Sequence, residues 1–90
     1  MREIIDQTQF RKDFKKMKKS GRFDVKDLLS VIEKLANENL LDAKHRDHQL
    51  TGDYIDCREC HVRPDTLLIY KLEPGQLILV RVGSHSELFD

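Results

Sequence analysis

Apolar residues in the first part of the chain recur at intervals of three and four, which is the period of one face of an α-helix. Phe10, Phe14 and Met17 follow this period and predict an amphipathic helix. The stretch before it, Arg2–Asp6, carries two β-branched residues and predicts a short strand. Gly21 is expected to end the helix, because glycine tolerates the left-handed conformation common after a helix C-terminus.

A second helix is predicted to open at Asp24 and to end near Asn37 and Asn39. Side chains that accept hydrogen bonds from the first turn favour the start of a helix. We therefore expect Asp24 to cap the second helix, and either Asp6 or Thr8 to cap the first. The predicted apolar face of the second helix consists of Val25, Leu28, Leu29, Ile32, Leu35 and Ala36.

The last part of the chain is rich in residues that favour strands. Three strands are predicted, at Tyr54–Val62, Thr66–Leu72 and Gln76–Val82, with turns at Arg63–Asp65 and Glu73–Gln76 between them. The middle strand is apolar at nearly every position, as expected of a central strand that is covered on both faces. The second turn has proline and glycine at its two central positions, the pattern of a type II turn.

The order of these elements is strand, helix, helix, strand, strand, strand. It predicts one α+β domain, residues 1–90, with both helices on one face of a small antiparallel sheet. The opening strand is expected at an edge of the sheet, and the other face is expected to remain open. Leu40–Gly52 is predicted to be a loop, and the chain is predicted to finish in a short helical turn that ends at Phe89.

The composition agrees with a small soluble domain, since 39% of the 90 residues are hydrophobic and 36% are charged. No apolar run approaches the roughly 20 residues needed to cross a bilayer. The first ten residues lack the apolar segment of a secretion signal. We therefore expect a cytoplasmic protein whose two cysteines remain reduced.

The formal net charge is zero, which argues mildly against nucleic-acid binding. The charge is uneven, however, because Phe10–Arg22 is strongly basic and Asp13 is its only acid. Such a run is more often the solvated face of a helix than a binding surface. The alternative is a patch that collects RNA.

The segment Cys57-Arg58-Glu59-Cys60-His61 has the spacing of a haem attachment motif, and its two cysteines also suggest zinc. Haem of this kind accompanies export, for which no signal is present. Zinc would need further ligands, such as His45 and His48. On a strand, residues three apart point to opposite faces, with Cα atoms about 10 Å apart, so the two thiols could not share a metal. Cys60 is instead expected to pack inward beside Val62.

The same alternation places Glu59 and His61 on one face of the strand. In the last strand it groups Leu77 and Leu79 with Arg81, and Ile78 and Val80 with Val82. If the second group covers the helices, Arg81 shares the open face with Glu59 and His61. A single arginine in such a strand is more often ion-paired than catalytic. A cation beside histidine and carboxylate is nevertheless what a phosphoryl site requires.

Four stretches in combination resemble the YafQ-type toxins of the RelE superfamily, from bacterial type II toxin–antitoxin modules. They are KHRDHQLTG, RECHVRPD, LLIYKL and VRVGSHSELF. The resemblance implies a RelE-like fold and a ribosome-dependent endoribonuclease, an mRNA interferase that halts translation. It also implies a cognate antitoxin, so that the toxin is a monomer when free and part of a hetero-oligomer when inhibited. No metal or other cofactor is expected.

The resemblance implies that the catalytic site is formed by the residues of this chain that match the motifs of the family. In the best-known member a tryptophan follows the motif aspartate, whereas this chain has Thr66, so a base-stacking contact is expected to be missing. RNA contacts are expected from basic residues. The expected catalytic residues are His48, Glu59, His61, Asp65, Arg81, His85 and Phe89, and the expected RNA-binding residues are Lys15, Lys18, Lys19, Arg46 and Arg63.

Metal-free cleavage of RNA uses the ribose 2′-OH as the nucleophile. Histidine suits the acid and base steps because both of its protonation states are available near neutral pH. Arg81 suits the phosphate, which its planar fork binds at two oxygens. We expect His85 to be the main acid or base, with His48 and His61 complementing it, Asp65 assisting one of them, and Phe89 ordering His85 or the base.

Each of these residues also has a structural interpretation. His48 and His61 could be satisfied structural histidines, and His45 and His85 could be plain surface residues. Two other functions therefore remain open: an inactive toxin homologue that only binds a partner protein, and a small zinc-binding regulator built on His45, His48, Cys57 and Cys60.

Overall fold

The computed structural model describes residues 1–21 and 24–89 of the chain, so Arg22, the end of the basic segment, lies outside the described residues. Two 3₁₀ turns, η1 (Ala43–His45) and η2 (Gly52–Tyr54), stand before and after β2. The predicted α+β class is confirmed. The remaining elements are β1 (Glu3–Asp6), α1 (Thr8–Ser20), α2 (Val25–Ala36), β2 (His48–Gln49), β3 (Arg58–Arg63), β4 (Thr66–Glu73), β5 (Gln76–Gly83) and α3 (His85–Phe89).

The strands form one sheet in the order β1-β5-β4-β3-β2. β1 lies at an edge, as predicted, but it pairs with β5 in parallel, while the other neighbours are antiparallel. The sheet is therefore mixed rather than antiparallel throughout. The chain passes through two helices between β1 and the later strands, and a crossover of this length allows a parallel return.

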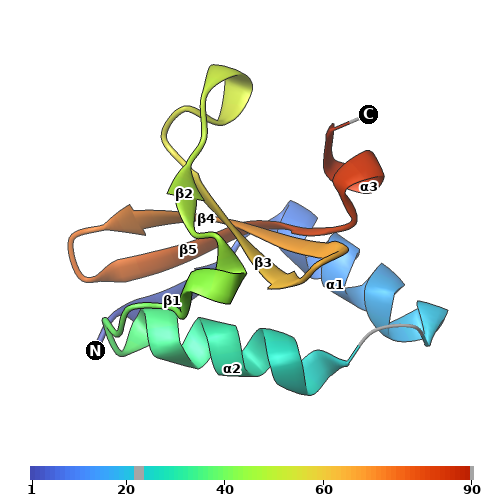
Figure 1. Cartoon of the computed structure of the whole chain (residues 1–90), viewed down its shortest axis with the longest axis horizontal. Coiled ribbons are helices and arrows are strands. Elements are labelled where there is room, and N and C mark those ends of the chain that lie inside the picture. Colours follow the sequence, from blue (N-terminus) through green and yellow to red (C-terminus); the bar gives the residue numbers. More distant parts are fainter. Residues whose placement is uncertain (22–23, 90) are drawn as a thin grey trace.

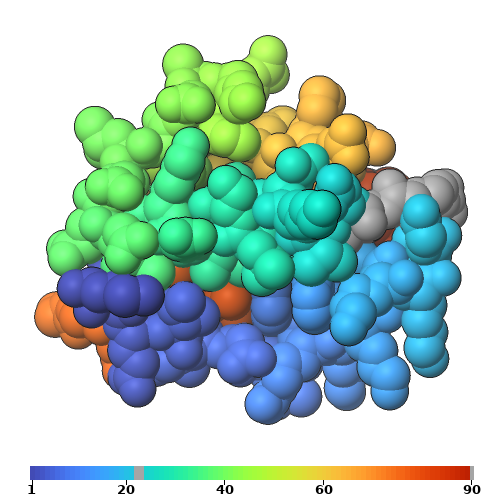
Figure 2. All heavy atoms as spheres, turned by 90° about the horizontal axis from the view of Figure 1, so that it is seen from below, coloured from blue at the N-terminus to red at the C-terminus, as the bar shows by residue number. Residues whose placement is uncertain are grey.

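Both long helices cover the same face of the sheet, as predicted, and they lie side by side over it (Figures 1 and 2). α1 packs mainly against β5, whereas α2 contacts both β3 and β5. Phe10 is buried, and Phe14 and Met17 pack against the same core, so the predicted stripe of α1 is confirmed. Within the described ranges, no helix has both the length and the apolar character needed to cross a membrane.

The two helices begin differently. The Asp24 carboxylate accepts a hydrogen bond from the Lys26 backbone N–H at 2.9 Å, which confirms the predicted cap of α2. The cap position of α1 is Gln7, which makes no side-chain capping bond. The prediction of Asp6 or Thr8 was wrong because Asp6 is the last residue of β1 and Thr8 is already helical.

The buried stripe of α2 differs from the predicted one at three residues, and one of them, Val25, is only partly buried. Leu29 is 53% exposed, while Val31, which was not included, is buried with Leu28 and Ile32. Each helical residue turns the side chain by about 100°, so positions i, i+3, i+4 and i+7 from Leu28 face the sheet and Leu29 points aside.

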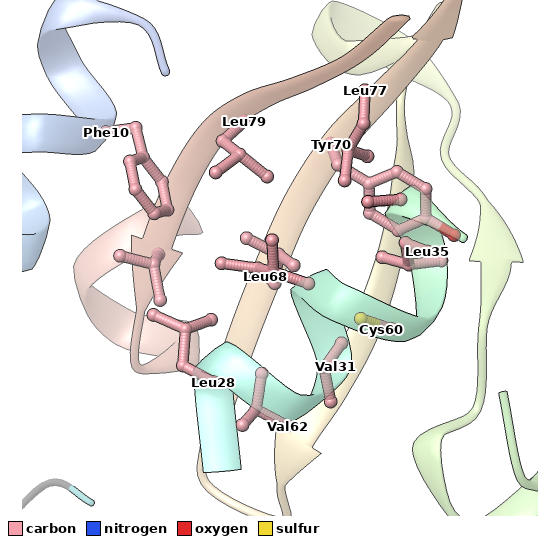
Figure 3. Close-up of a cluster of buried hydrophobic side chains, with 13 residues drawn as sticks. Phe10, Leu28, Val31, Leu35, Cys60, Val62, Leu68, Tyr70, Leu77 and Leu79 are labelled. Carbon is pink, nitrogen blue, oxygen red and sulfur yellow. The ribbon is translucent and has the colours of Figure 1, made fainter. Parts of the chain in front are cut away.

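β4 is the centre of the molecule, with side chains buried on both faces as predicted. Leu68 and Tyr70 join the core beneath the helices (Figure 3). Leu67 and Ile69 point the other way, into a second cluster with Leu88 of α3. The face opposite the helices, which was expected to be open, is thus partly covered by α3 and by the segment around η2.

The region between α2 and β3 is more ordered than predicted. The expected loop Leu40–Gly52 contains η1 and the two-residue strand β2. The strand expected to start at Tyr54 starts only at Arg58, because the chain turns at η2 and the Cys57 N–H bonds to the Tyr54 carbonyl at 2.8 Å. Gly52, which opens this turn, has a φ of 71°, a value that favours glycine.

A β-bulge in β5 breaks the alternation on which the prediction for this strand depended. Tyr70 pairs with Leu79, and the preceding residue Ile69 pairs with Arg81, so Val80 is the extra residue. Leu77 and Leu79 therefore face the helices, opposite to the prediction. Arg81 is nevertheless on the face away from the helices, because it is the partner of Ile69.

We predict that Leu68→Ala lowers the free energy of unfolding by roughly 2–5 kcal/mol, because it opens a cavity between the sheet and the helices. Leu72→Ala on the same strand is the matched control, since Leu72 is 38% exposed and Leu68 is fully buried. The control should cost about 1 kcal/mol or less. Urea unfolding followed by circular dichroism measures both values, and equal losses would contradict the assigned core.

Candidate functional site

Four of the expected site residues lie on the sheet face away from the helices. Directly paired residues of neighbouring strands share a face. His48 pairs with Glu59, Glu59 with Ile69, and Ile69 with Arg81, so these residues form one row across β2, β3, β4 and β5. His61 stands two residues after Glu59 on β3 and shares its face.

Glu59 lies between the two imidazoles of this group. Its Oε1 atom is 3.5 Å from His61 Nε2 and 3.8 Å from His48 Nε2. The Glu59 side chain is only 8% exposed, whereas the His48 side chain is half exposed. These distances exceed a hydrogen bond, so the contact is electrostatic in this geometry. The buried carboxylate stabilises a positive charge on whichever ring carries an extra proton.

The tautomer of His48 follows from its other nitrogen. His48 Nδ1 lies 2.6 Å from the backbone carbonyl oxygen of Arg46. A carbonyl oxygen only accepts hydrogen bonds, so Nδ1 is the nitrogen that carries the proton. In the neutral ring, Nε2 is therefore unprotonated and is free to accept a proton on the side facing Glu59.

The segment that carries His48 is fastened to the sheet through Asp47. The Asp47 carboxylate accepts hydrogen bonds from the Tyr70 hydroxyl and, at 3.2 Å, from Arg58 Nε. Burial and the bond to Asp47 raise the pKa of the Tyr70 hydroxyl, so it remains a donor near neutral pH. This network was not predicted from the sequence, where its signal is an acid directly before a candidate histidine.

A second anchor is His45, which was expected to be a surface residue. Its side chain is buried, and Nδ1 donates a hydrogen bond of 2.7 Å to the His61 carbonyl oxygen. η1 is thereby tied to the strand that carries His61. The surface interpretation was wrong because β2 begins only at His48 and does not reach the part of β3 at His61, where the imidazole supplies the missing donor.

Arg81 is held by a carboxylate of α1. Its Nε and Nη2 atoms donate to the Asp13 carboxylate at 2.7 and 3.2 Å, and the Val82 backbone N–H adds a bond of 3.2 Å. The bond to Asp13 raises the pKa of the guanidinium, and the neighbouring Tyr54 acts in the same direction. Arg81 is thus a fixed cation. Asp13 was missed as a partner, although it was the only acid in a basic segment.

Aromatic contacts lead from Arg81 to the C-terminal helix. Tyr54 meets Phe89 edge to face, with ring centroids 6.0 Å apart, and Phe89 lies 5.0 Å from the His85 ring. α3 approaches β5 closely, since a Cβ atom at Gly83 would lie 3.3 Å from atoms of Glu87 and Leu88. His85 and Phe89 are thus linked to Arg81 through Tyr54, which the sequence analysis did not select.

Other expected site residues lie apart from this group. Asp65 is exposed in the turn between β3 and β4, where it accepts a 3.4 Å hydrogen bond from Thr66. It lines a cavity of about 390 Å³ with Lys16 and Glu87 rather than the face of His48. No contact joins His85 directly to His48 among the described residues.

The expected RNA-binding residues are dispersed. Lys15, Lys18 and Lys19 are exposed on α1, and Lys18 Nζ stands 5.5 Å from the centre of the Phe14 ring. Arg46 is exposed beside His48, in a left-handed conformation with a φ of 47°. Arg63 Nε is 3.5 Å from an Asp27 oxygen. The expected RNA-binding residues therefore form two separate basic regions, one on α1 and one beside β3.

The two cysteines do not form a site. Cys60 belongs to the core beneath the helices, as predicted, and Cys57 to the cluster on the other face. Burial raises the pKa of the Cys60 thiol to about 12 and also raises that of Cys57. Within the described residues, no group of three or more potential ligands is arranged for a metal. The zinc set with His45 and His48 is therefore wrong.

Comparison with known proteins agrees with this architecture. Residues 2–90 match the family model described as a bacterial toxin of type II toxin–antitoxin system, YafQ. The chain is 38% identical over 89 residues to the mRNA interferase toxin YafQ of Escherichia coli strain K12, covering 98% of this chain and 96% of that protein.

Solved structures have the same fold. YafQ in the E. coli DinJ–YafQ complex has a TM-score of 0.91 and 36% identity, with both chains fully covered. A metal-bound toxin from Helicobacter pylori also has a TM-score of 0.91, with 47% identity over 99% of this chain and all of that one.

The family match over residues 2–90, with the fold it shares with the solved toxins, places the chain among the small bacterial toxins of the type II toxin–antitoxin class. Within that class, the chain belongs to the YafQ family. The resemblance found in the sequence is thereby confirmed, and the expected enzyme class, an mRNA interferase, agrees with the name of the E. coli relative.

We predict that Asp13→Ala lowers the free energy of unfolding by roughly 1.5–3 kcal/mol, because Arg81 and the Val82 N–H lose a charged acceptor at a largely buried position. Asp6→Ala is the matched control, since Asp6 is exposed and should change stability by about 0.5 kcal/mol or less. Thermal or urea unfolding measures both. A loss no larger than that of the control would show that Asp13 does not hold Arg81 in solution.

Proposed function

We propose that this protein is a ribosome-dependent endoribonuclease that cuts mRNA without a metal ion and thereby halts translation. The observation that carries the proposal is the row formed by His48, Glu59 and Arg81, with His61 beside it, on one face of the sheet. A proton acceptor, a buried carboxylate and a fixed cation on one surface suit in-line attack on a phosphodiester. The name of the E. coli relative supports the same activity.

In this mechanism His48 is the general base. The bond from its Nδ1 to the Arg46 carbonyl leaves Nε2 to take the proton of the ribose 2′-OH. The 2′-oxygen then forms a bond to phosphorus. Glu59, 3.8 Å away, stabilises the imidazolium that results. His61 contacts the same Glu59 carboxylate from the other side. It completes the part of the site that takes up the proton.

Arg81 and His85 act on the other side of the phosphate. Two guanidinium nitrogens of Arg81 already bind Asp13, so the remaining one faces a non-bridging phosphate oxygen. His85 donates a proton to the departing 5′-oxygen as its bond to phosphorus breaks, leaving a 2′,3′-cyclic phosphate. Phe89, in ring contact with both His85 and Tyr54, orients the imidazole. His85 and His48 are not in contact, and in this mechanism the bound RNA lies between them.

The remaining expected residues have supporting roles in the proposal. Asp65 is proposed to contact RNA or ribosome at the turn after β3, and not to assist a histidine, because it lines a different cavity. The exposed lysines of α1 and the arginines beside the site attract the RNA backbone. These are Lys15, Lys18, Lys19, Arg46 and Arg63.

The proposed partners are the ribosome with its mRNA, and an antitoxin. The E. coli relative was crystallised in a complex with DinJ. We propose that residues 1–90 act as one toxin domain in the cytoplasm, as a free monomer when active and in a hetero-oligomer with a cognate antitoxin when inhibited.

We predict that His85→Ala slows mRNA cleavage by about 10²–10⁴-fold, as expected for the loss of a general acid. The measurement is primer extension on an mRNA translated in a reconstituted system with purified toxin. Ser86→Ala is the matched control, because Ser86 is also exposed on α3, and its rate should equal that of the wild type. His85→Ala is preferred to a change at Arg81, whose loss would also free Asp13.

Wild-type cleavage rates in the His85→Ala protein would overturn the assignment of the acid. A wild-type protein that neither cuts mRNA nor arrests translation would overturn the proposed function. It would favour an inactive toxin homologue that only binds a partner protein. The observation in favour of that alternative is Thr66, which is buried and offers no base-stacking surface where the best-known relative has tryptophan.

A further inference from the structure

We propose that a cavity between α2 and the outer edge of β3 binds a phosphate group of the RNA next to the scissile one. This inference rests on the proposed function and names a subsite of the same site. The cavity, called the α2 pocket below, has a volume of about 360 Å³. The residues that line it include Ser30, Lys34, Lys44, His45, His61 and Arg63.

The α2 pocket is continuous with the proposed catalytic group through His61. His61 is one of the residues that line the pocket, and its Nε2 atom is 3.5 Å from Glu59 Oε1. The main chain of His61 is fixed as well, because its carbonyl oxygen accepts the bond from the buried His45. The proposed catalytic group and the α2 pocket therefore adjoin at His61, at the outer edge of β3, and an RNA strand that passes around this edge reaches both.

The pocket exists because β2 is short. β2 pairs only with Arg58 and Glu59, so within residues 1–21 and 24–89 no strand lies beside the outer edge of β3 from His61 onward. η1 lies against the strand at His45, and α2 forms the opposite wall. The result is a hollow with side chains from three elements. An uncovered sheet edge of this kind is a place where proteins accept a ligand or partner.

The pocket carries an excess of positive charge although the whole chain is neutral. Lys34, Lys44 and Arg63 line it, with Asp27 as its only acid. Lys44 is exposed and makes no ion pair with any other residue that the structure describes. The net formal charge of the lining, three cations and one acid, is thus +2 with both histidines neutral.

The ion pairs already present are weak enough to be exchanged for a phosphate. Lys34 Nζ is 3.9 Å from Asp42, and Arg63 Nε is 3.5 Å from Asp27. All four side chains are at least 40% exposed, and exposed pairs of this kind contribute little. A phosphate offers Arg63 two oxygens for its planar fork and offers Lys44 its first partner.

The size and position of the α2 pocket favour a nucleotide phosphate over other anionic groups. Its volume is at the lower end of the range of roughly 300–1,000 Å³ for ligand sites, which suits a phosphate with its ribose. Phosphate contacts fix the register of a nucleic acid without reading its sequence. Here they would hold the neighbouring ribose 2′-OH against His48. The basic residues of α1 are less suited to this, because α1 packs mainly on β5, whereas the pocket lies beside β3.

The direct test uses a single-stranded tetranucleotide with 2′-O-methyl riboses, which keeps its phosphates but has no nucleophile. Titrated into the isotopically labelled full chain, it should shift the amide signals of Lys44, His45 and Arg63. Lys44→Glu should weaken its affinity by about 5- to 10-fold at low salt and reduce the slope of log K against log salt by about 0.7, the value for one lost phosphate contact.

Arg11→Glu is the matched control. It changes the charge by the same amount on an exposed residue of α1 that does not line the α2 pocket. Its affinity should stay within about two-fold of the wild type. If both substitutions weakened the affinity for the tetranucleotide equally, the overall charge would explain the effect, and the inference would be overturned. Absence of shifts at Lys44 and His45 would also overturn it.

The test separates the inference from the function on which it rests, because binding of the uncleavable RNA needs no catalysis. Lys34→Glu, on a different element, repeats the measurement should Lys44→Glu disturb η1. A His85→Ala protein that still cuts mRNA, together with a Lys44→Glu protein that binds poorly, would contradict the mechanism and support the pocket. The opposite pair of results would contradict the pocket alone.

Discussion

The direction of Arg81 depends on one extra residue in β5. Without the bulge at Val80, strict alternation from Leu79 would bring Arg81 opposite Leu68, beneath the helices. The bulge shifts the register by one position, so Arg81 pairs with Ile69 and reaches the face that carries Glu59. A bulge also lets Val82 return to the core with Leu68. One irregularity thus serves both a packed core and a cation on the opposite surface.

Local patterns predicted the elements of the fold well, since helical stripes and central strands are set by periodic burial. The glycine at the end of α1 and the Asp24 cap followed from the same local chemistry. Features that depend on pairing between distant segments could not be predicted. The parallel return of β1 to β5 and the bulge at Val80 are of this kind, because neither leaves a signal within its own strand.

In the candidate site, too, features set by the local sequence could be predicted, whereas contacts between distant segments could not. Alternation along β3 correctly joined Glu59 to His61, and the motifs put forward His48 and His85 as candidates. The partners that hold these residues come from elsewhere: Asp13 from α1 for Arg81, and Tyr70 from β4 for the segment of His48. Their side chains are ordinary in sequence terms, and only the tertiary structure gives them a functional neighbour. Asp65 lies in the turn after β3 and lines another cavity, which its motif could not indicate because the motif fixes only its position along the chain.

The burial of both cysteines affects how the protein reacts with oxidants. Peroxides and disulfides react with the thiolate form, and a thiol with a pKa of about 12, as in Cys60, supplies almost none of it at neutral pH. Cys57 is shielded in the same way on the other face of the sheet. In the folded protein, burial therefore disfavours oxidation of either thiol.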